Sequence, residues 1–425
     1  MQNQPHNLII IGGGAAGLMA AITASSNNSQ DQKVLLLEKG PKLGRKVLIS
    51  GGGRCNVTNN KHQSIRDFLK NYPRGSKFLW GPFSRFSHQD TMAWFSERGL
   101  KLKTEEDGRV FPVSDDSADV MRVLEDQCLR NKVEIRLNQN VKDIEFQSDS
   151  IKKLILSDGT ELLCKNLIIA CGGMSYQKTG SSGDAYGWAV KAGHQIVPPK
   201  ASLTGLVSKD VWVHELKGLA LPEIELKLFA NDYLLAKECG ALLFTHWGVS
   251  GPGVFKITSL AAGSDYSSGK YELFLNLFPK EKPQKLKESL RQSLRQTWRE
   301  NPRRRTKNCL DKMFPERLQE TILSFVFLNP EKTCAEISNS ELEQIVEHLT
   351  NLKINIAGIC PSGEEIVTAG GVCLDEVDSK TMESKLQKGL YWVGEVLDLD
   401  GFTGGYNLQA AWSTGFVAGS SVGLE

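Results

Sequence analysis

A glycine-rich turn near the amino terminus has the spacing of a phosphate-binding site. Gly12, Gly14 and Gly17 fit the pattern G-x-G-x-x-G, with Ala15 and Ala16 between the last two glycines. The first glycine permits a tight turn, the second lets the backbone approach a pyrophosphate, and the third allows a helix to pack on a strand. The amino end of that helix presents free N–H groups to negative charge. The turn therefore predicts a phosphate site, although the pattern alone is weakly specific.

An acidic residue adds a second part to the same site. Glu38 stands 21 residues after Gly17, at the end of the next expected strand. A carboxylate at this position accepts hydrogen bonds from the ribose hydroxyls of an adenosine. It also disfavours a 2′-phosphate, because the two negative groups would repel each other. Together the turn and Glu38 predict an ADP-containing cofactor, against the alternative of a plain glycine turn.

Three consecutive glycines offer a surface for a flat ring. Gly51, Gly52 and Gly53 have no side chains, so a planar ligand can lie against their backbone. Cys55 follows in the same loop, and as a lone thiol it is expected to be structural. The alternative is a surface loop of ordinary turn residues. The neighbouring side chains that offer donors to a ring or positive charge to a pyrophosphate are Arg45, Lys46, Arg54, Asn56 and Thr58.

Two further clusters end apolar runs later in the chain. Ala170, Cys171 and Gly172 end one run, and Gly394 and Glu395 end the other. A carboxylate directly after a strand suits a hydrogen bond to a polyol hydroxyl. These clusters predict additional cofactor contacts beyond the phosphate turn.

A last pair of glycines precedes the final expected helix. The amino end of a helix carries about half a positive charge. After Gly404 and Gly405, such an end would favour negative charge at the N1–C2=O edge of a reduced flavin. The alternative is a simple strand, turn and helix. The following residues predicted to line this edge are Tyr406, Asn407, Leu408 and Gln409.

The elements that must position these clusters follow from the apolar pattern. Short, continuously apolar runs predict strands buried on both faces, and a parallel sheet joins such strands with short connections. The Asp158-Gly159 pair predicts a hairpin. The expected strands are 8–11, 34–37, 133–137, 141–146, 151–156, 161–164, 167–170 and 389–393, and the expected helices are 15–25, 64–71, 89–98, 116–130 and 408–417.

The order of these patterns predicts an α/β protein with an interrupted domain. Both ends of the chain contribute to one nucleotide-binding domain, and a β-rich and helical insertion separates them. The predicted parts are a nucleotide-binding domain of residues 1–197 and 367–425, a β-rich part of residues 198–280 and 351–366, and a helical part of residues 281–350.

Composition excludes several classes of protein. The chain has 425 residues, of which 40% are hydrophobic and 24% charged, as in soluble globular proteins of two or three domains. Its apolar runs are too short to span a membrane, and its first residues lack a secretory pattern, which favours a cytoplasmic location. The nine cysteines have no C-x-x-C spacing, so neither a zinc ribbon nor a dithiol motif is expected, and no metal is predicted.

One segment is strongly basic although the net charge of the chain is only +2. Residues 280–307 hold 11 basic and 3 acidic residues, a local charge of +8. Basic residues recur every four positions beside an apolar row, which predicts an amphipathic helix. Its basic face is expected to be solvated, or alternatively to meet nucleic acid or an acidic protein. The basic row is Lys287, Arg291, Arg295, Arg299 and Arg303, and the apolar row is Leu286, Leu290, Leu294 and Trp298.

The combined motifs resemble those of the flavoproteins that carry two dinucleotide-binding motifs, of the glutathione-reductase structural type. More narrowly, the chain resembles the HI0933-like flavoprotein family, also called BaiN-like or aminoacetone-oxidase-like. Five motifs carry the resemblance in order between Leu8 and Gly419: IIIGGGAAGL, GRKVLISGGGRCNVTN, THWGVSGP, VTAGGV and GEVLDLDGFTGGYNLQAAWSTG. Cys171 departs from the broader pattern, which tends to have Thr, and the cysteine motifs of tRNA-modifying relatives are not evident.

This resemblance implies tightly bound FAD and a Rossmann-like fold. The implied domain has a central parallel sheet plus a β-meander, interrupted by a β-barrel and a helical subdomain. The implied FAD contacts are Gly12–Gly17, Glu38, Lys39, Arg45, Lys46, the Gly51–Thr58 loop, Val141, Ala170–Gly172, Gly394, Glu395 and Gly404–Gln409.

The sequence predicts the cofactor better than the reaction, because a flavin itself carries the hydride chemistry. His246 and Tyr176 are candidate catalytic residues, each with the alternative of a structural role. No second nucleotide-binding unit appears, so NAD(P)H is expected at most as a transient electron donor. The predicted function is FAD-dependent oxidation or reduction of a small molecule. The alternatives are a flavoprotein that binds or modifies RNA through residues 280–307, and a non-catalytic FAD sensor.

Overall fold

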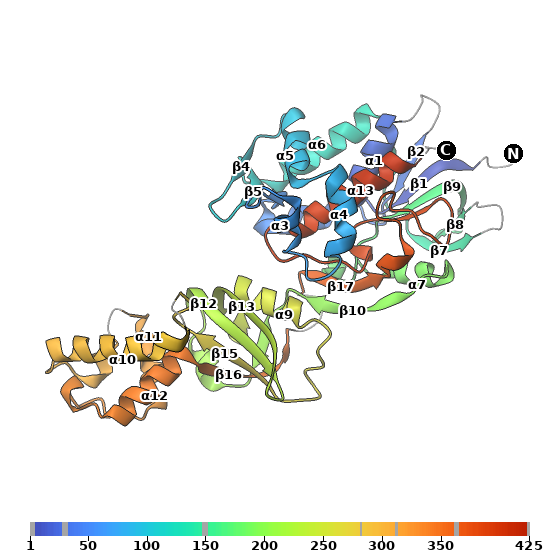
Figure 1. The fold of residues 1–425 in the computed structure, drawn as a ribbon. Helices are drawn as coiled ribbons and strands as arrows, with labels where there is room; N and C mark the ends of the chain where they lie inside the picture. The colour runs from blue at the N-terminus through green and yellow to red at the C-terminus, as the bar shows by residue number, and fades with distance from the viewer. Residues whose placement is uncertain are drawn as a thin grey trace. The chain divides into compact units, whose positions relative to one another are not determined.

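A computed structural model describes residues 5–27, 33–146, 152–280, 283–310, 313–360 and 365–422. The chain divides into two compact units, which are described separately (Figure 1). The first comprises Met1–Ser202 and Ser362–Glu425, and the second comprises Leu203–Pro361. The barrel-like and helical parts expected from the sequence thus fall in one unit. The exact boundaries of the predicted three-part division stay a prediction.

Parallel strands from both ends of the chain form the centre of the first unit. β1 (His6–Ile11) lies between β2 (Val34–Leu37) and β9 (Glu161–Ile169), and β9 also pairs with β18 (Leu390–Trp392). All three pairings are parallel. The strands are apolar and buried, as expected where helices cover both faces of a sheet. The prediction that the two ends of the chain share one sheet is confirmed.

The outer strands complete a seven-stranded sheet in the described residues. β6 (Glu134–Arg136) pairs with β2 in parallel, whereas β7 (Val141–Phe146) and β8 (Lys152–Leu156) run antiparallel and lead into β9. The hairpin predicted at Asp158-Gly159 therefore forms. The strands predicted at 161–164 and 167–170 are one strand, because residues between them keep an extended backbone paired with β1.

Two helices that lie far apart in the sequence pack against each other. These are α1 (Ala15–Asn27) and α13 (Tyr406–Ser421), and both are longer than predicted. A Cβ atom on Gly415 would lie 2.3 Å from the backbone oxygen of Ala16. One on Gly419 would lie 2.5 Å from the oxygen of Ala20. The close approach of the helices therefore requires small residues at the contact.

The remaining elements of the first unit surround this core (Figure 1). A small antiparallel sheet has the order β3-β5-β4, and β10 pairs with β17. The strands are β3 (Thr58–Asn59), β4 (Leu102–Thr104), β5 (Arg109–Pro112), β10 (Ile196–Ser202) and β17 (Val367–Val372). The helices are α2 (Arg45–Ile49), η1 (Ser50–Gly53), α3 (Ile65–Leu69), α4 (Ser76–Arg85), α5 (His88–Glu97), α6 (Ser117–Arg130), η2 (Gln177–Thr179), α7 (Asp184–Lys191), η5 (Leu374–Glu376) and η6 (Gly394–Val396).

The second unit contains the closed β-barrel that the resemblance implied. Its strand order is β11-β14-β13-β12-β15-β16. The strands are β11 (Leu206–Ser208), β12 (Ala220–Ala230), β13 (Tyr233–Phe244), β14 (Gly248–Ser250), β15 (Tyr271–Asn276) and β16 (Leu352–Ile359). The helices are α8 (Val211–Glu215), α9 (Pro252–Leu260), α10 (Pro283–Glu300), η3 (Thr306–Asn308), α11 (Glu316–Phe325), η4 (Cys334–Glu336) and α12 (Asn339–Thr350).

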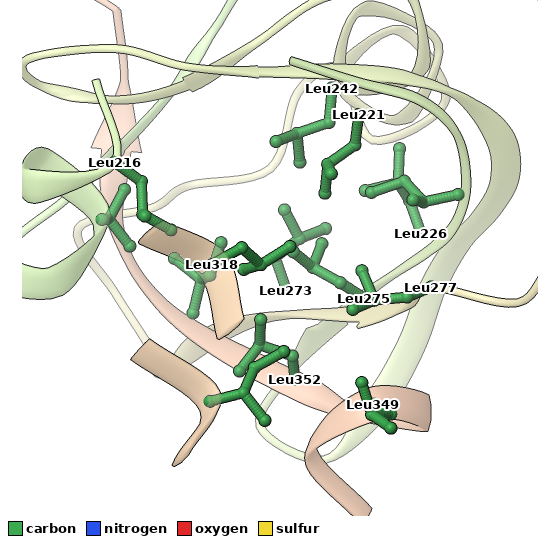
Figure 2. Close-up of a cluster of buried hydrophobic side chains, with 14 of the residues drawn as sticks. Leu216, Leu221, Leu226, Leu242, Leu273, Leu275, Leu277, Leu318, Leu349 and Leu352 are labelled. Carbon is green, nitrogen blue, oxygen red and sulfur yellow. The ribbon is translucent and has the colours of Figure 1, made fainter. Parts of the chain in front are cut away.

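One hydrophobic core joins the barrel to its helices. Figure 2 shows leucines of the barrel strands, such as Leu226 and Leu273, gathered in one cluster with Leu318 and Leu349. Leu318 lies on α11 and Leu349 on α12. The helices therefore depend on the barrel for much of their buried apolar contact.

The basic helix differs from its prediction in two ways. The apolar row of α10 is buried as predicted, but the helix ends at Glu300, ahead of Pro302, so Arg303 does not continue the row. The basic row is also not simply solvated. Lys287 pairs with Glu347, and Arg291 pairs with both Glu343 and Glu288. α12 therefore neutralises part of the basic face.

None of the helices in the described part of the chain combines the length and the apolar character needed to cross a lipid bilayer.

The contact between α1 and α13 makes a testable prediction. Gly415→Ala should lower the free energy of unfolding by about 1–3 kcal/mol, because the added methyl group overpacks the interface. Gly187→Ala is the control: Gly187 is exposed on α7, and a Cβ there meets nothing within 4 Å. That change should be neutral or stabilising by up to about 1 kcal/mol. Urea unfolding of both variants measures the difference, and equal stabilities would contradict the assigned contact.

Candidate functional site

The predicted glycine clusters follow the carboxyl ends of neighbouring parallel strands. Gly12 follows β1 and its N–H donates to Leu37 O on β2 (2.8 Å). Ala170 follows β9 and donates to Ile11 O on β1 (2.9 Å). Val393, at the end of β18, donates to Ile169 O on β9 (3.1 Å). Ligands of open α/β sheets bind outside this edge. The fold therefore brings together segments that are up to about 380 residues apart in sequence (393 − 12).

The turn after β1 has the geometry that its glycines predicted. A Cβ on Gly12, whose φ is +109°, would lie 2.5 Å from Ala170 O, and one on Gly17 would lie 1.9 Å from Gly12 O. In contrast, a Cβ on Gly14 would meet nothing within 4 Å. The first turn of α1 carries Ala15 and Ala16 and no acidic side chain. Its backbone N–H groups have no partner inside the helix. This open, electropositive turn fits a pyrophosphate.

Glu38 lies directly beside this turn. Its Oε2 accepts a hydrogen bond from Gly13 N (2.8 Å), and its Oε1 accepts one from Gly40 N (2.6 Å). The carboxylate is thus held at the end of β2 by backbone groups, and each oxygen can accept a further bond. Its position matches that expected of a ribose-binding acid. Val141, another predicted contact, is buried at the start of β7.

The loop of residues 51–58 is bonded to the start of α13. Thr58 Oγ1 donates to Gln409 Oε1 (2.6 Å), and Asn59 Nδ2 donates to Gly404 O (2.9 Å). Trp412 Nε1 donates to Val57 O (3.0 Å). Two motifs from opposite ends of the sequence therefore form one wall.

Gln409 contributes to this wall rather than offering a free amide. Its side chain is fully buried, and its Nε2 donates to Thr91 Oγ1 and Ser413 Oγ, both at 2.9 Å. Tyr406 is also buried, against Phe68 and Tyr72. The side chains of these two residues are used in packing, so a contact to a ligand from this turn would come from its backbone.

The start of α13 is open to a negatively charged group. Unlike α5, α6 and α12, this helix has no side-chain hydrogen bond at its N-cap, which is Gly405, and no acidic residue in its first turn. Asn407 instead closes the preceding turn by bonding to Gly401 N (2.8 Å) and O (2.7 Å). Leu408 is half-buried. The electrostatic feature predicted for the flavin edge is therefore present.

The glycine triplet has a left-handed backbone conformation, which glycine adopts more readily than other residues. All three residues have positive φ, and a Cβ on Gly52 or Gly53 would meet nothing within 4 Å. Open backbone of this kind fits a planar ring. Cys55 has positive φ and is completely buried, and burial raises the pKa of its thiol to about 12. The structural role expected of Cys55 is consistent with this position.

The predicted cations all have protein partners. Lys46 Nζ lies 2.5 Å from both Glu395 Oε2 and Ser175 Oγ. Arg54 pairs with Glu105 (2.8 Å), and its guanidinium lies 3.8 Å from the centre of the Phe111 ring. The predicted contacts of Arg54 with a ring and of Lys46 with a pyrophosphate stay predictions, and both side chains already have a carboxylate partner. Lys39 pairs with Asp184, and Arg45 donates to Lys178 O.

Glu395 is the centre of a network that the sequence did not reveal. Its Oε1 accepts hydrogen bonds from Ser175 Oγ (2.6 Å) and Thr368 N (2.9 Å). Thr368 Oγ1 in turn accepts from Met174 N (2.7 Å). Thr368 belongs to the VTAGGV motif, and this motif is the feature of the sequence that could have indicated its place at the site. The network joins β17, η6 and the loop after β9 at the candidate site.

The two candidate catalytic residues fall in different units. Tyr176 follows Ser175 in the loop after β9, and its ring centre lies 6.0 Å from Lys46 Nζ. It therefore belongs to the same edge as the glycine clusters. His246 is exposed between β13 and β14 of the second unit. Catalytic roles for both residues stay predictions.

The parallel sheet, the open phosphate turn after β1 and the uncapped start of α13 define a Rossmann-type flavoprotein that binds FAD. FAD fits these residues for two reasons. The backbone of Gly14, Gly52 and Gly53 is open on the side where a Cβ would lie, and Glu38 is held beside the phosphate turn. The chain belongs to the HI0933-like family, whose Rossmann-domain model matches residues 6–421.

Two characterised relatives and one solved structure are similar to the chain. The chain is 30% identical over 399 residues to a ribosomal RNA dihydrouridine synthase of Haemophilus influenzae, covering 93% of each chain. It is 30% identical over 389 residues to a 3-dehydro-bile acid delta(4,6)-reductase of Clostridium scindens, covering 91% of this chain and 92% of that protein. A 3-ketosteroid-delta4-(5alpha)-dehydrogenase of Rhodococcus jostii shares the fold, with a TM-score of 0.53 at 11% identity over 100% of this chain and 98% of that one.

The position of Glu38 leads us to predict that its carboxylate contributes to the affinity for FAD. Glu38→Gln should weaken FAD binding roughly 10- to 100-fold, because charge-assisted hydrogen bonds contribute about 1.5–3 kcal/mol. The ratio of FAD to protein after gel filtration measures this. Glu161→Gln, at the opposite end of β9 and exposed, is the matched control and should retain FAD. Full retention by the Glu38 variant would contradict the assigned role.

The burial of Cys55 makes a prediction about thiol reactivity. At pH 8 a thiol with a pKa of about 12 is almost wholly protonated, so native Cys55 should resist iodoacetamide. Cys239 is exposed and should react first. Mass spectrometry of the native protein, with urea-unfolded protein as the control, measures both sites. Comparable rates at the two cysteines in native protein would argue against a structural role for Cys55.

Proposed function

We propose that the protein is an FAD-dependent reductase of carbon–carbon double bonds conjugated to a carbonyl group. The observation that carries the proposal is the convergence of the glycine clusters at one edge of the sheet. The names of the relatives supply the reaction type. Dihydrouridine is uridine with its C5=C6 bond saturated next to a carbonyl, and a delta(4,6)-reductase of a 3-dehydro bile acid saturates bonds conjugated to a ketone.

The residues of the site have separate roles in this proposal. The start of α1 would hold the pyrophosphate, and Glu38 the adenosine ribose. The glycine triplet would support the flavin ring of FAD. The start of α13 would stabilise negative charge at the N1–C2=O edge of that ring. FAD, when bound, supplies a carrier that accepts and donates hydride.

The overall reaction requires a reductant and a proton. NAD(P)H gives up a hydride, which reaches the β-carbon of the conjugated bond, and a proton adds to the α-carbon, so that the products are NAD(P)⁺ and the saturated carbonyl compound. Tyr176 is the candidate proton donor in the first unit, because its loop lies at the edge where the ring would bind. His246 is the alternative candidate proton donor.

The substrate class has two candidates with this same chemistry. One is a small enone, as the bile-acid relative suggests, and the other is a uridine in ribosomal RNA, as the Haemophilus relative suggests.

The location proposed for the protein is the cytosol. All nine cysteines are free thiols, which supports a reducing compartment.

Anaerobic flavin reduction tests the proposal. NADH or NADPH should bleach the FAD absorbance of the full-length protein, and a conjugated enone should restore it with formation of the saturated product. A saturated ketone is the control and should not reoxidise the flavin. Tyr176→Phe should slow the reoxidation if Tyr176 donates the proton. Reoxidation by oxygen but not by any conjugated enone would point to an oxidase, and failure of every donor to reduce the flavin would favour a sensor; either result would overturn the proposal.

A further inference from the structure

A cluster of basic side chains, most of them unpaired among the described residues, begins at the end of α10 and continues beyond it. The segment of residues 299–307, here called the basic loop, contains five basic residues and one acidic residue, a charge of +4 (5 − 1). Arg305 pairs with Glu331. The other four make no side-chain hydrogen bond or ion pair with the described residues. These four are Arg299, Arg303, Arg304 and Lys307.

This segment therefore differs from the earlier turns of α10. On α10, Lys287 and Arg291 are paired with glutamates of α12, and Arg295 donates to Asn339 (2.8 Å). The charges of Lys287 and Arg291 are therefore balanced by carboxylates within the protein, whereas Arg295 is held by a neutral amide. The basic loop keeps its charge available for an external partner, although the sequence pattern makes the two segments look like one continuous stripe.

The basic loop is held in place by buried groups. Thr306 is fully buried, its Oγ1 donates to Asn329 O (2.7 Å), and its N–H donates to Lys332 O (2.9 Å). Cys334 N donates to Arg304 O (2.7 Å). Trp298, also buried, donates to Cys309 O (3.1 Å). Arginines on a fixed backbone lose less conformational freedom on binding than those on a flexible tail.

An exposed aromatic residue lies on the segment that anchors this loop. Phe327 is 91% exposed, the largest exposed fraction among the large hydrophobic side chains that the structure describes. It stands two residues before Asn329, which accepts the bond from Thr306. Its φ is +54°, a conformation that is rare for a bulky residue. No packing requirement accounts for an exposed phenylalanine in a strained conformation.

The combination points to a partner that carries phosphates and unstacked bases. Guanidinium groups bind phosphate oxygens in bidentate fashion, and an exposed aromatic ring stacks on an unpaired base. An acidic protein would need an apolar side chain beside its carboxylates to cover Phe327, whereas each nucleotide of an unpaired strand carries both a phosphate and a base that can stack. We infer that the basic loop and Phe327 form a binding surface for an unpaired segment of ribosomal RNA. The inference rests on the proposed function in its RNA form and locates where such a substrate is held.

Binding of protein-free ribosomal RNA to the FAD-loaded full-length protein tests the surface. The triple variant Arg303→Gln, Arg304→Gln, Lys307→Gln should weaken binding roughly tenfold or more at 0.1 M salt. It should also lower the slope of log affinity against log salt by about 2, since each contact to single-stranded phosphate contributes about 0.7. The control is Lys33→Gln, Lys101→Gln, Lys209→Gln, which removes the same charge from exposed lysines outside the loop.

Phe327→Ala tests the stacking contact separately. It should weaken binding about tenfold and leave the salt slope unchanged, because stacking involves no counterion release. Tyr233→Ala is the matched control, since Tyr233 is an aromatic residue of the same unit that is 78% exposed. The FAD content of each variant verifies that it is folded.

Three outcomes would overturn the inference. These are no RNA binding by the unmodified protein at low salt, equal losses in the loop variant and its lysine control, and displacement of the RNA by polyglutamate as effective as by competing RNA. Each is distinct from failure of the proposed function, because reduction of a small enone by the unmodified protein tests that chemistry without RNA.

Discussion

The pairing of β18 with β9 is the contact on which the candidate site depends. β18 comes from the last tenth of the chain, and its parallel register on β9 places Gly394 and Glu395 beside the turns that follow β1 and β9. The packing of α13 on α1 then fixes the second helix end over the same edge. Both contacts are made by apolar or very small residues. The polar groups of the site are therefore positioned by apolar core residues that are not themselves expected to react or to bind the cofactor through polar groups.

Local spacing determined what could be predicted from the sequence. The phosphate turn, Glu38 and the strands on either side lie within one short segment, and their geometry follows from the residue types. The partners of the cations could not be found in this way. Lys46 contacts Glu395, which lies 349 residues further along the chain, and the contact forms only because β18 pairs with β9. Gln409 likewise looked like a ligand residue but is buried in a network with Thr58 and Thr91.

The basic segment of residues 280–307 also shows that tertiary contacts could not be predicted from the sequence pattern. Periodicity alone continues the basic row through Arg303, but Pro302 ends the helix before that position is reached. Which arginines keep their charge free depends on the acidic residues of α12, whose position periodicity does not reveal. The sequence thus predicted a basic region correctly but not which part of it is available. Substrate identity depends on this kind of tertiary detail, whereas the cofactor depends mainly on local motifs.

The placement of β18 also affects the order in which the protein can be assembled during synthesis. The second unit is a continuous stretch of chain and can collapse around its own leucine core as soon as residue 361 leaves the ribosome. The first unit must wait, with β1 and β9 already made, until the last strand and helix emerge. A chain that has made β9 but not yet β18 therefore has an incomplete sheet edge, and the glycine clusters cannot converge until residues 390–421 are in place.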